Sequence, residues 1–110
     1  MQVTGYDHLV STVVGSQKWS KLLFNNVHVL SIAAMIDEGD STINSKTLQV
    51  KLALSQSTVQ RVLRVFEGVG LLARQERKTR TEPLRYRRIP HDFWSSASDL
   101  HEAAEVAGRS

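Results

Sequence analysis

The sequence predicts a single domain of residues 1–110 in the α+β class, mainly helical with one small β-hairpin. Three observations support this prediction. Apolar residues recur at helical spacing in three segments, 17–38, 44–70 and 90–107. Just before the last of them, residues 84–87 alternate between apolar and basic side chains, as in a half-buried strand. No repeat, low-complexity tract or linker rich in Gly, Ser and Pro divides the chain.

Composition excludes several classes of protein. The hydrophobic share of 41% is too high for a chain that is disordered throughout. Cysteine is absent and the four histidines are not paired as in a zinc site, so we expect no metal and no cofactor. The longest strongly apolar stretch, 27–36, is well short of the roughly twenty residues that cross a bilayer. Because the N-terminus also lacks a signal-peptide pattern, we expect a cytoplasmic protein without membrane contact.

The first part of the chain is expected to be helical. Residues 3–14 fit either a strand or a short helix, and Gly15 and Ser16, read as a stop and a new N-cap, favour the helix. A long helix is then predicted over residues 17–38, ended by Gly39. Its apolar residues spread well beyond one face, so this helix has to be covered on more than one side.

Two short helices joined by a tight turn are predicted in residues 44–70. Thr42 and Ile43 can pair as a minimal strand, after which Asn44 or Ser45 can cap a helix that runs to about residue 53. Ser55 can cap a second helix that opens at residue 56 and is closed by Gly70.

The second of these helices has two separated faces. Its apolar side chains are spaced by three and four residues, and so are polar side chains on the opposite face. The expected packed face consists of Val59, Val62, Leu63, Phe66 and Val69. The expected exposed face consists of Ser57, Gln60, Arg61 and Arg64.

A β-hairpin is predicted over residues 71–89, with a basic tip between Arg77 and Pro83. Pro90 ends its second strand because proline cannot donate to a strand ladder. The remaining segment, 90–107, is expected to form an amphipathic C-terminal helix with a role in dimerisation.

Charge is unevenly distributed along the chain. Residues 46–88 hold eleven Lys or Arg against three acids, a net charge of +8. The remainder holds three basic and eight acidic residues, a net charge of −5. This segregation suits a polyanionic partner at one part of the protein and a different role for the rest.

Residues 45–88 resemble the helix-turn-helix and wing of winged-helix transcription regulators, in particular the MarR-like group. The similarity lies in Leu48 and Leu52, in the run Leu54-Ser-Gln-Ser-Thr-Val-Gln-Arg, and in Phe66 with Gly70-Leu71-Leu72. It covers about two-fifths of the chain. The resemblance implies a winged helix-turn-helix fold, with additional N- and C-terminal helices, that binds double-stranded DNA.

The physical argument leads to the same partner, because the major groove of B-DNA admits an α-helix whose first turns reach the base edges. The residues expected to contact bases are Gln56, Ser57, Gln60 and Arg61. The residues expected to contact the DNA backbone are Thr58 and Arg64, with Lys46 and Lys51 of the preceding helix. The wing residues expected to meet the backbone or the adjacent minor groove are Arg77, Lys78 and Arg80.

We therefore expect a sequence-specific DNA-binding protein, a transcriptional regulator that acts as a nucleoid-associated homodimer and has no enzymatic activity. The alternatives are a winged-helix interaction module, such as a replication or partition accessory, and a non-specific architectural DNA binder. No phosphate-binding loop or catalytic constellation occurs in the sequence. The sequence leaves open whether a small-molecule effector controls the protein.

Overall fold

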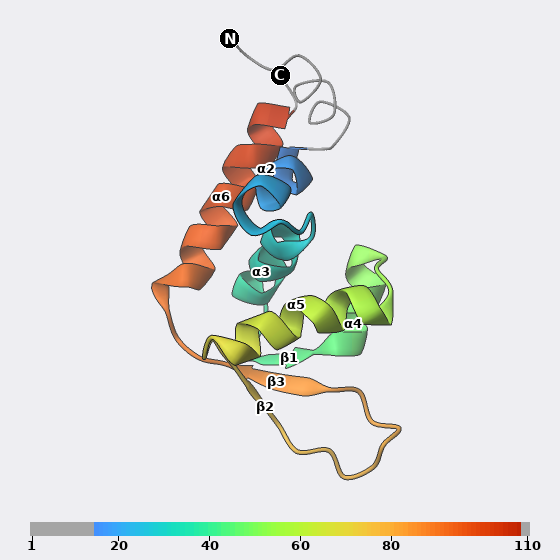
Figure 1. The fold of residues 1–110 in the computed structure, drawn as a ribbon. Coiled ribbons are helices and arrows are strands. Elements are labelled where there is room, and N and C mark those ends of the chain that lie inside the picture. The colour runs from blue at the N-terminus through green and yellow to red at the C-terminus, as the bar shows by residue number, and fades with distance from the viewer. Residues whose placement is uncertain (1–14, 109–110) are drawn as a thin grey trace.

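The structure is a computed structural model that describes residues 15–108 (Figure 1). The alternatives for residues 3–14 lie outside this range. The described residues confirm the mainly helical α+β class, with a small antiparallel sheet. In chain order the elements are α2 (Gly15–Phe24), α3 (Val29–Glu38), β1 (Thr42–Asn44), α4 (Ser45–Leu52), α5 (Gln56–Gly68), β2 (Leu72–Arg74), β3 (Arg85–Arg88) and α6 (Asp92–Gly108).

The sheet has three strands in the order β1-β3-β2, all antiparallel. The predicted hairpin is present as β2 and β3, and the minimal strand at Thr42 and Ile43 pairs with the other edge of β3. Tyr86 lies opposite Ile43 on one side and opposite Arg74 on the other. Tyr86 and Ile43 are buried whereas Arg85 and Arg87 are exposed, so one face of the sheet covers the core and the other is basic.

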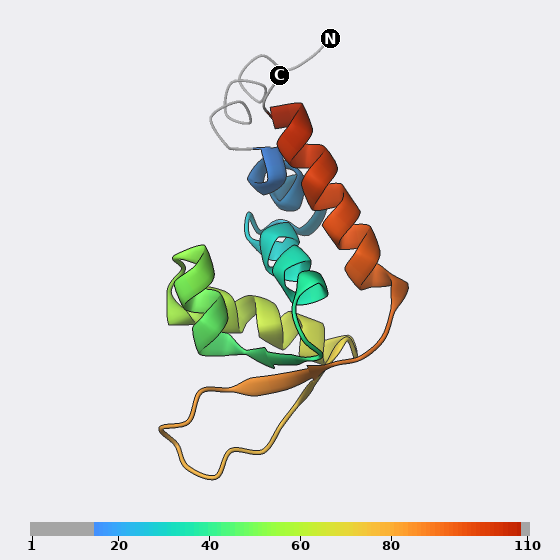
Figure 2. The same cartoon turned by 180° about the vertical axis from the view of Figure 1, so that it is seen from behind.

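Helix α3 lies at the centre of the core. Leu30, Ile32 and Ala33 have no exposed surface, and α3 is in contact with α2, α4, α5 and α6 (Figure 2). The expectation that this segment is covered on more than one side is therefore confirmed. All of this cover comes from the chain itself.

An aromatic cluster joins α5 to α6. The ring of Phe66 contacts Phe93 and Trp94 edge-on, with centroids 5.6 and 5.1 Å apart. The indole N–H of Trp94 donates to the backbone carbonyl of Ile89 at 3.0 Å, so its polar atom is satisfied inside the core. The start of α6 is thereby held against the end of α5.

The single helix predicted over residues 17–38 is wrong, because the chain breaks between α2 and α3. Asn25 adopts a left-handed conformation with φ 57°, and the side chain of Asn26 accepts a bond from the His28 N–H at 2.8 Å. Buried Ser20 donates to the Asn26 carbonyl and accepts from the Leu30 N–H at 3.1 Å. These bonds satisfy backbone groups that a continuous helix would have paired internally.

The break also changes which apolar residues are covered. Once α2 turns away from α3, Leu22 and Leu23 no longer share the face that packs, and the two residues are 52% and 58% exposed. Phe24 is exposed as well. The apolar stripe predicted for one continuous helix is therefore interrupted, and these three residues lie outside the packed face.

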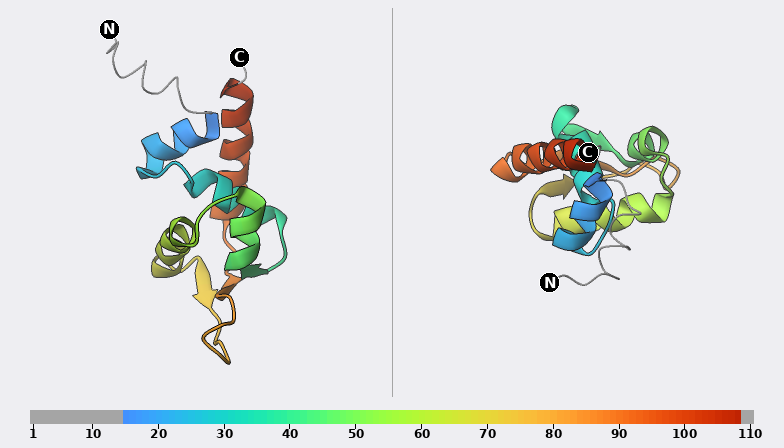
Figure 3. Two further views of the ribbon diagram at one scale, coloured as in Figure 1. Left: turned by 90° about the vertical axis from the view of Figure 1, so that its right-hand side faces the viewer. Right: turned by 90° about the horizontal axis from the view of Figure 1, so that it is seen from above.

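The molecule is elongated, with extents of 55 × 26 × 22 Å (Figure 3). One end is formed by α2 and the C-terminal part of α6, and the opposite end by the loop that joins β2 and β3. We call residues 75–84 the hairpin loop. Within residues 15–108, no helix is both long and apolar enough to pass through a membrane.

Candidate functional site

Helices α4 and α5 are positioned by local capping bonds. The side chain of Asn44 accepts from the N–H groups of Lys46 and Thr47 at 2.9 and 3.3 Å, so Asn44, not Ser45, is the N-cap. Ala53 ends α4 in the left-handed conformation. Ser55 accepts from the Thr58 N–H at 3.2 Å, which confirms its predicted capping role.

Ser45 ties α4 to the hairpin. It is almost fully buried, and its N–H donates to the carbonyl of Leu84 at 2.9 Å. Because Leu84 directly precedes β3, this bond joins the start of α4 to the end of the hairpin loop. The end of the loop therefore lies beside the start of α4.

Helix α5 has the two faces that its sequence predicts, with one exception. Val59, Val62, Leu63 and Phe66 are buried, whereas 67% of Val69 is exposed. Val69 is the C-cap residue and no longer follows the helical path, so the periodicity fails there. The opposite face is more accessible, with Gln60 half-buried and four residues exposed: Gln56, Ser57, Arg61 and Arg64.

A groove of about 290 Å³ lies between the N-terminal parts of α4 and α5 and the hairpin loop. Its wall includes residues from three separate stretches of the sequence. Five of the predicted site residues line it: Lys46, Gln56, Gln60, Arg77 and Arg80. Sequence reasoning did not include the other lining residues, which are Ser45, Gln49, Thr81, Glu82, Pro83 and Leu84.

The remaining predicted residues of α5 lie outside this groove. Ser57 and Arg61 each follow a groove residue directly and are therefore turned by roughly 100° from it, whereas Arg64 lies one turn beyond Gln60. Thr58 is half-buried, and its hydroxyl accepts from the Ser55 hydroxyl at 2.8 Å. The structure therefore gives Thr58 a role in the N-cap of α5.

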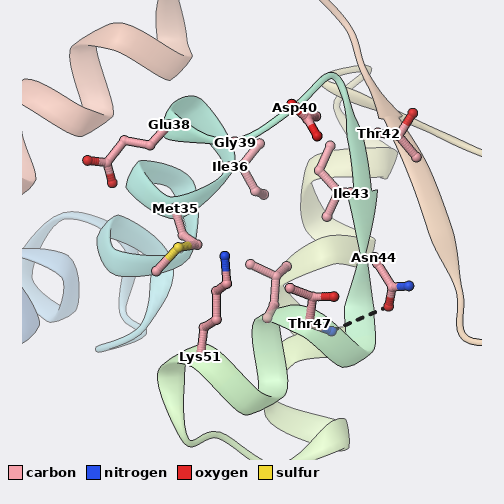
Figure 4. A pocket seen from close by; sticks show the side chains of 11 residues that line it. Met35, Ile36, Glu38, Gly39, Asp40, Thr42, Ile43, Asn44, Thr47 and Lys51 are labelled. Carbon is pink, nitrogen blue, oxygen red and sulfur yellow. Dashed lines mark hydrogen bonds between the residues drawn. The ribbon is translucent and has the colours of Figure 1, made fainter.

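Lys51 lies on another side of α4. It lines a second cavity, between α3 and β1, and its side chain points into that cavity (Figure 4). It lies five positions after Lys46, which places the two lysines about 140° apart around a helix. Lys46 and Lys51 therefore do not share one surface.

The hairpin loop is held by its own hydrogen bonds. The Arg77 guanidinium donates to the carbonyls of Arg80 and Glu82, each at 3.3 Å. The Glu82 carboxylate accepts from the Lys78 N–H at 2.9 Å. Arg77 thus braces the loop, while the side chains of Lys78 and Arg80 are exposed at its tip.

Two further arginines of the basic segment are bonded to other groups of the chain. Arg74 pairs with Glu67 at 2.9 Å, and this hydrogen bond is the main reason that the pKa of Arg74 is raised. Arg88 donates to the carbonyls of Ile36, Asp37 and Gly39, which caps the C-terminus of α3. Part of the +8 charge therefore stabilises the fold.

Arg85 and Arg87 are exposed on the outer face of β3 and were not assigned a role by the sequence. Within residues 15–108, no group of three or more His, Asp or Glu residues is arranged to hold a metal ion.

The elements and the groove together define a small α+β protein with a cationic groove between two helices and a hairpin loop. No family model matches the chain, and no curated protein sequence matches it.

Proposed function

We propose that this chain is a winged helix-turn-helix protein that binds specific sequences of double-stranded DNA as a transcriptional regulator. The observation that carries the proposal is the groove, which gathers Lys46, Gln56, Gln60 and Arg80 from three stretches of sequence. Cations and amides are the groups that contact DNA phosphates and base edges. The order helix, strand, two helices and hairpin in α3 to β3 is the order of a winged helix.

In this proposal α5 enters the major groove. Gln56 and Gln60 can bond adenine edges, and Arg61 can bond a guanine with two parallel hydrogen bonds. Ser57 contributes at the first turn, where the helix comes nearest the bases. These side chains lie on the polar half of α5, whose other half is buried in the core.

The other cations contact the DNA backbone. Lys46 and Arg64 flank the base-reading stripe, and Lys78 and Arg80 project from the tip of the hairpin loop. The loop then acts as the wing, and its internal bonds reduce the entropy lost on binding. Lys51 is left out of this surface because its side chain points into the other cavity.

We also propose that the protein acts as a homodimer through the end formed by α2 and α6. Helix α3 gives no support for a dimer, because its apolar faces are covered within the chain. The support comes from exposed apolar residues of the outer helices, which are Leu22, Leu23, Phe24, Leu100 and Val106. This end lies opposite the hairpin loop, so dimerisation and DNA binding would not compete.

Selection from random duplex oligonucleotides tests the function. A regulator should enrich one consensus, with half-sites about one helical turn apart if the protein is a two-fold dimer. Titration of a random duplex at several salt concentrations provides the second measurement. Tight binding without a consensus would replace the proposal with an architectural DNA binder, and absence of binding would replace it with a protein-interaction module.

A further inference from the structure

The cavity that Lys51 lines is separate from the proposed DNA surface. It measures about 390 Å³ and lies between the C-terminal end of α3, β1 and the inner side of α4 (Figure 4). This volume falls within the range of small-molecule sites, which is about 300–1,000 Å³. The cavity shares no lining residue with the groove beside the hairpin loop, although different residues of α4 line each of them.

Three apolar residues of the core lie at the floor of the cavity. Ile36, Ile43 and Leu48 line it, and each belongs to the buried core. Met35 adds a flexible thioether at one side. A ligand with a branched or aromatic apolar body would displace water from this floor.

Opposite charges lie at the two ends of this floor. The ammonium group of Lys51 points into the cavity from α4, and Asp40 lies at the far end, in the turn between α3 and β1 (Figure 4). Glu38 points outward in the same view. Within residues 15–108 the one ion pair is Arg74 with Glu67, so neither Lys51 nor Asp40 has a salt-bridge partner there.

From this arrangement we infer that the cavity binds a small zwitterion with an apolar body, namely a free amino acid or a short peptide. The ligand carboxylate pairs with Lys51, its ammonium group pairs with Asp40, and its side chain rests on Ile36, Ile43 and Leu48. A simple anion would pair with Lys51 alone, and a simple cation would pair with Asp40 alone. A zwitterion satisfies both groups at once.

Such a ligand would connect the turn after α3 to α4. Because α4 precedes α5 and is bonded to the hairpin through Ser45, this bridge would alter how α4 sits beside the groove. This regulatory consequence rests on the proposed DNA binding. Ligand binding itself does not, and it can be measured without DNA.

Isothermal titration calorimetry of the full chain tests the site with L-leucine and the dipeptide L-leucyl-L-leucine as probes. We expect saturable binding of at least one of them. Leucinamide lacks the carboxylate and 4-methylpentanoate lacks the ammonium group, so each should bind about tenfold more weakly than L-leucine, the loss of one charge-assisted hydrogen bond. The same comparison with N-acetylated and amidated forms applies to the dipeptide.

Variants identify the site. Lys51→Met and Asp40→Asn should each weaken the better zwitterion about tenfold, whereas Lys21→Met, which alters a lysine of α2, should leave its affinity unchanged. Circular dichroism confirms that each variant is folded. Absence of saturation by either probe, or equal binding of the half-charged analogues, would overturn the inference. Because these titrations contain no DNA, their failure is distinct from failure of the proposed regulator.

Discussion

Gly15 and Ala104 bring α2 and α6 into backbone contact, since a Cβ atom on Gly15 would overlap the carbonyl oxygen of Ala104. Two polar contacts hold the same junction. The Ser16 N–H donates to the Glu105 carboxylate at 2.9 Å, and the Ser16 hydroxyl is hydrogen-bonded to Nδ1 of His101. The first turn of α2 is therefore docked at a spacing that glycine alone permits.

This contact makes Gly15→Ala destabilising even though alanine favours helices. The added methyl group forces the two helices apart, and we expect the free energy of unfolding to fall by about 1–3 kcal/mol. Urea denaturation followed by circular dichroism measures the change. Gly68→Ala is the matched control, because a Cβ there meets no atom within 4 Å. Equal effects of the two substitutions would contradict the close approach.

Replacing Arg88 with methionine should cost stability because the carbonyls at the end of α3 lose a cationic donor. Hydrogen bonds to charged groups contribute about 1.5–3 kcal/mol, so we expect a loss of that order. Arg87→Met, on the exposed face of the same strand, should change the free energy of unfolding by less than about 0.5 kcal/mol. Thermal and urea unfolding compare the two variants. An Arg88 variant as stable as the Arg87 variant would contradict the capping role.

Substitution of Arg61 with alanine should reduce sequence discrimination more than overall DNA affinity. If Arg61 bonds one base, affinity for the selected site should fall by about 1–3 kcal/mol, with preference lost at one base position. Fluorescence anisotropy with the selected site, its single-base variants and a random duplex measures both effects. A uniform loss across all sequences would instead assign Arg61 to the backbone.

The double substitution Lys78→Ala and Arg80→Ala should weaken binding to every sequence alike. Each lost phosphate contact lowers the slope of log K against log salt by about 0.9, so the slope should fall by about 2. The control pair is Arg85→Ala with Arg87→Ala, which removes the same charge from the outer face of the sheet. A similar fall in both pairs would show that net charge, not loop contact, is responsible.

The proposed dimer predicts that Leu23→Glu produces a monomer. Leu23 is 58% exposed in the single chain, so the charge is tolerated in the monomer but would be buried between two copies. Sedimentation at micromolar concentration should show a dimer for the parent and a monomer for this variant. Val50→Glu, at a 70% exposed site on α4, should remain dimeric. A monomeric parent would remove the homodimer from the proposal.

The sequence predicted best those features that depend on residues close together in the chain. The capping serine before α5, its buried stripe from Val59 to Phe66 and the alternation around Tyr86 all depend on neighbouring residues, and the structure confirms them. The break between α2 and α3 was missed because apolar spacing continues across it. Asn25 and Asn26 were the available signal, since asparagine readily leaves the helical conformation.

For the candidate site too, the sequence predicted the residue types but not how they come together. Sequence alone supplied the cations and amides of Lys46, Gln56, Gln60 and Arg80, because exposed polar residues at helical spacing are visible in one dimension. Their meeting in one groove depends on the bond from Ser45 to Leu84, which joins residues 39 positions apart.

The sequence by itself determined the helical and strand periodicities and the segregation of charge. Each of these depends only on the order of residues along the chain. Only the tertiary structure decided which arginines serve the fold. Arg88 reaches the end of α3 from 52 residues away, and Arg77 braces its own loop. A charged side chain looks the same in a sequence whether it faces water or caps a distant helix. The difference arises from long-range packing, which places a carbonyl within its reach.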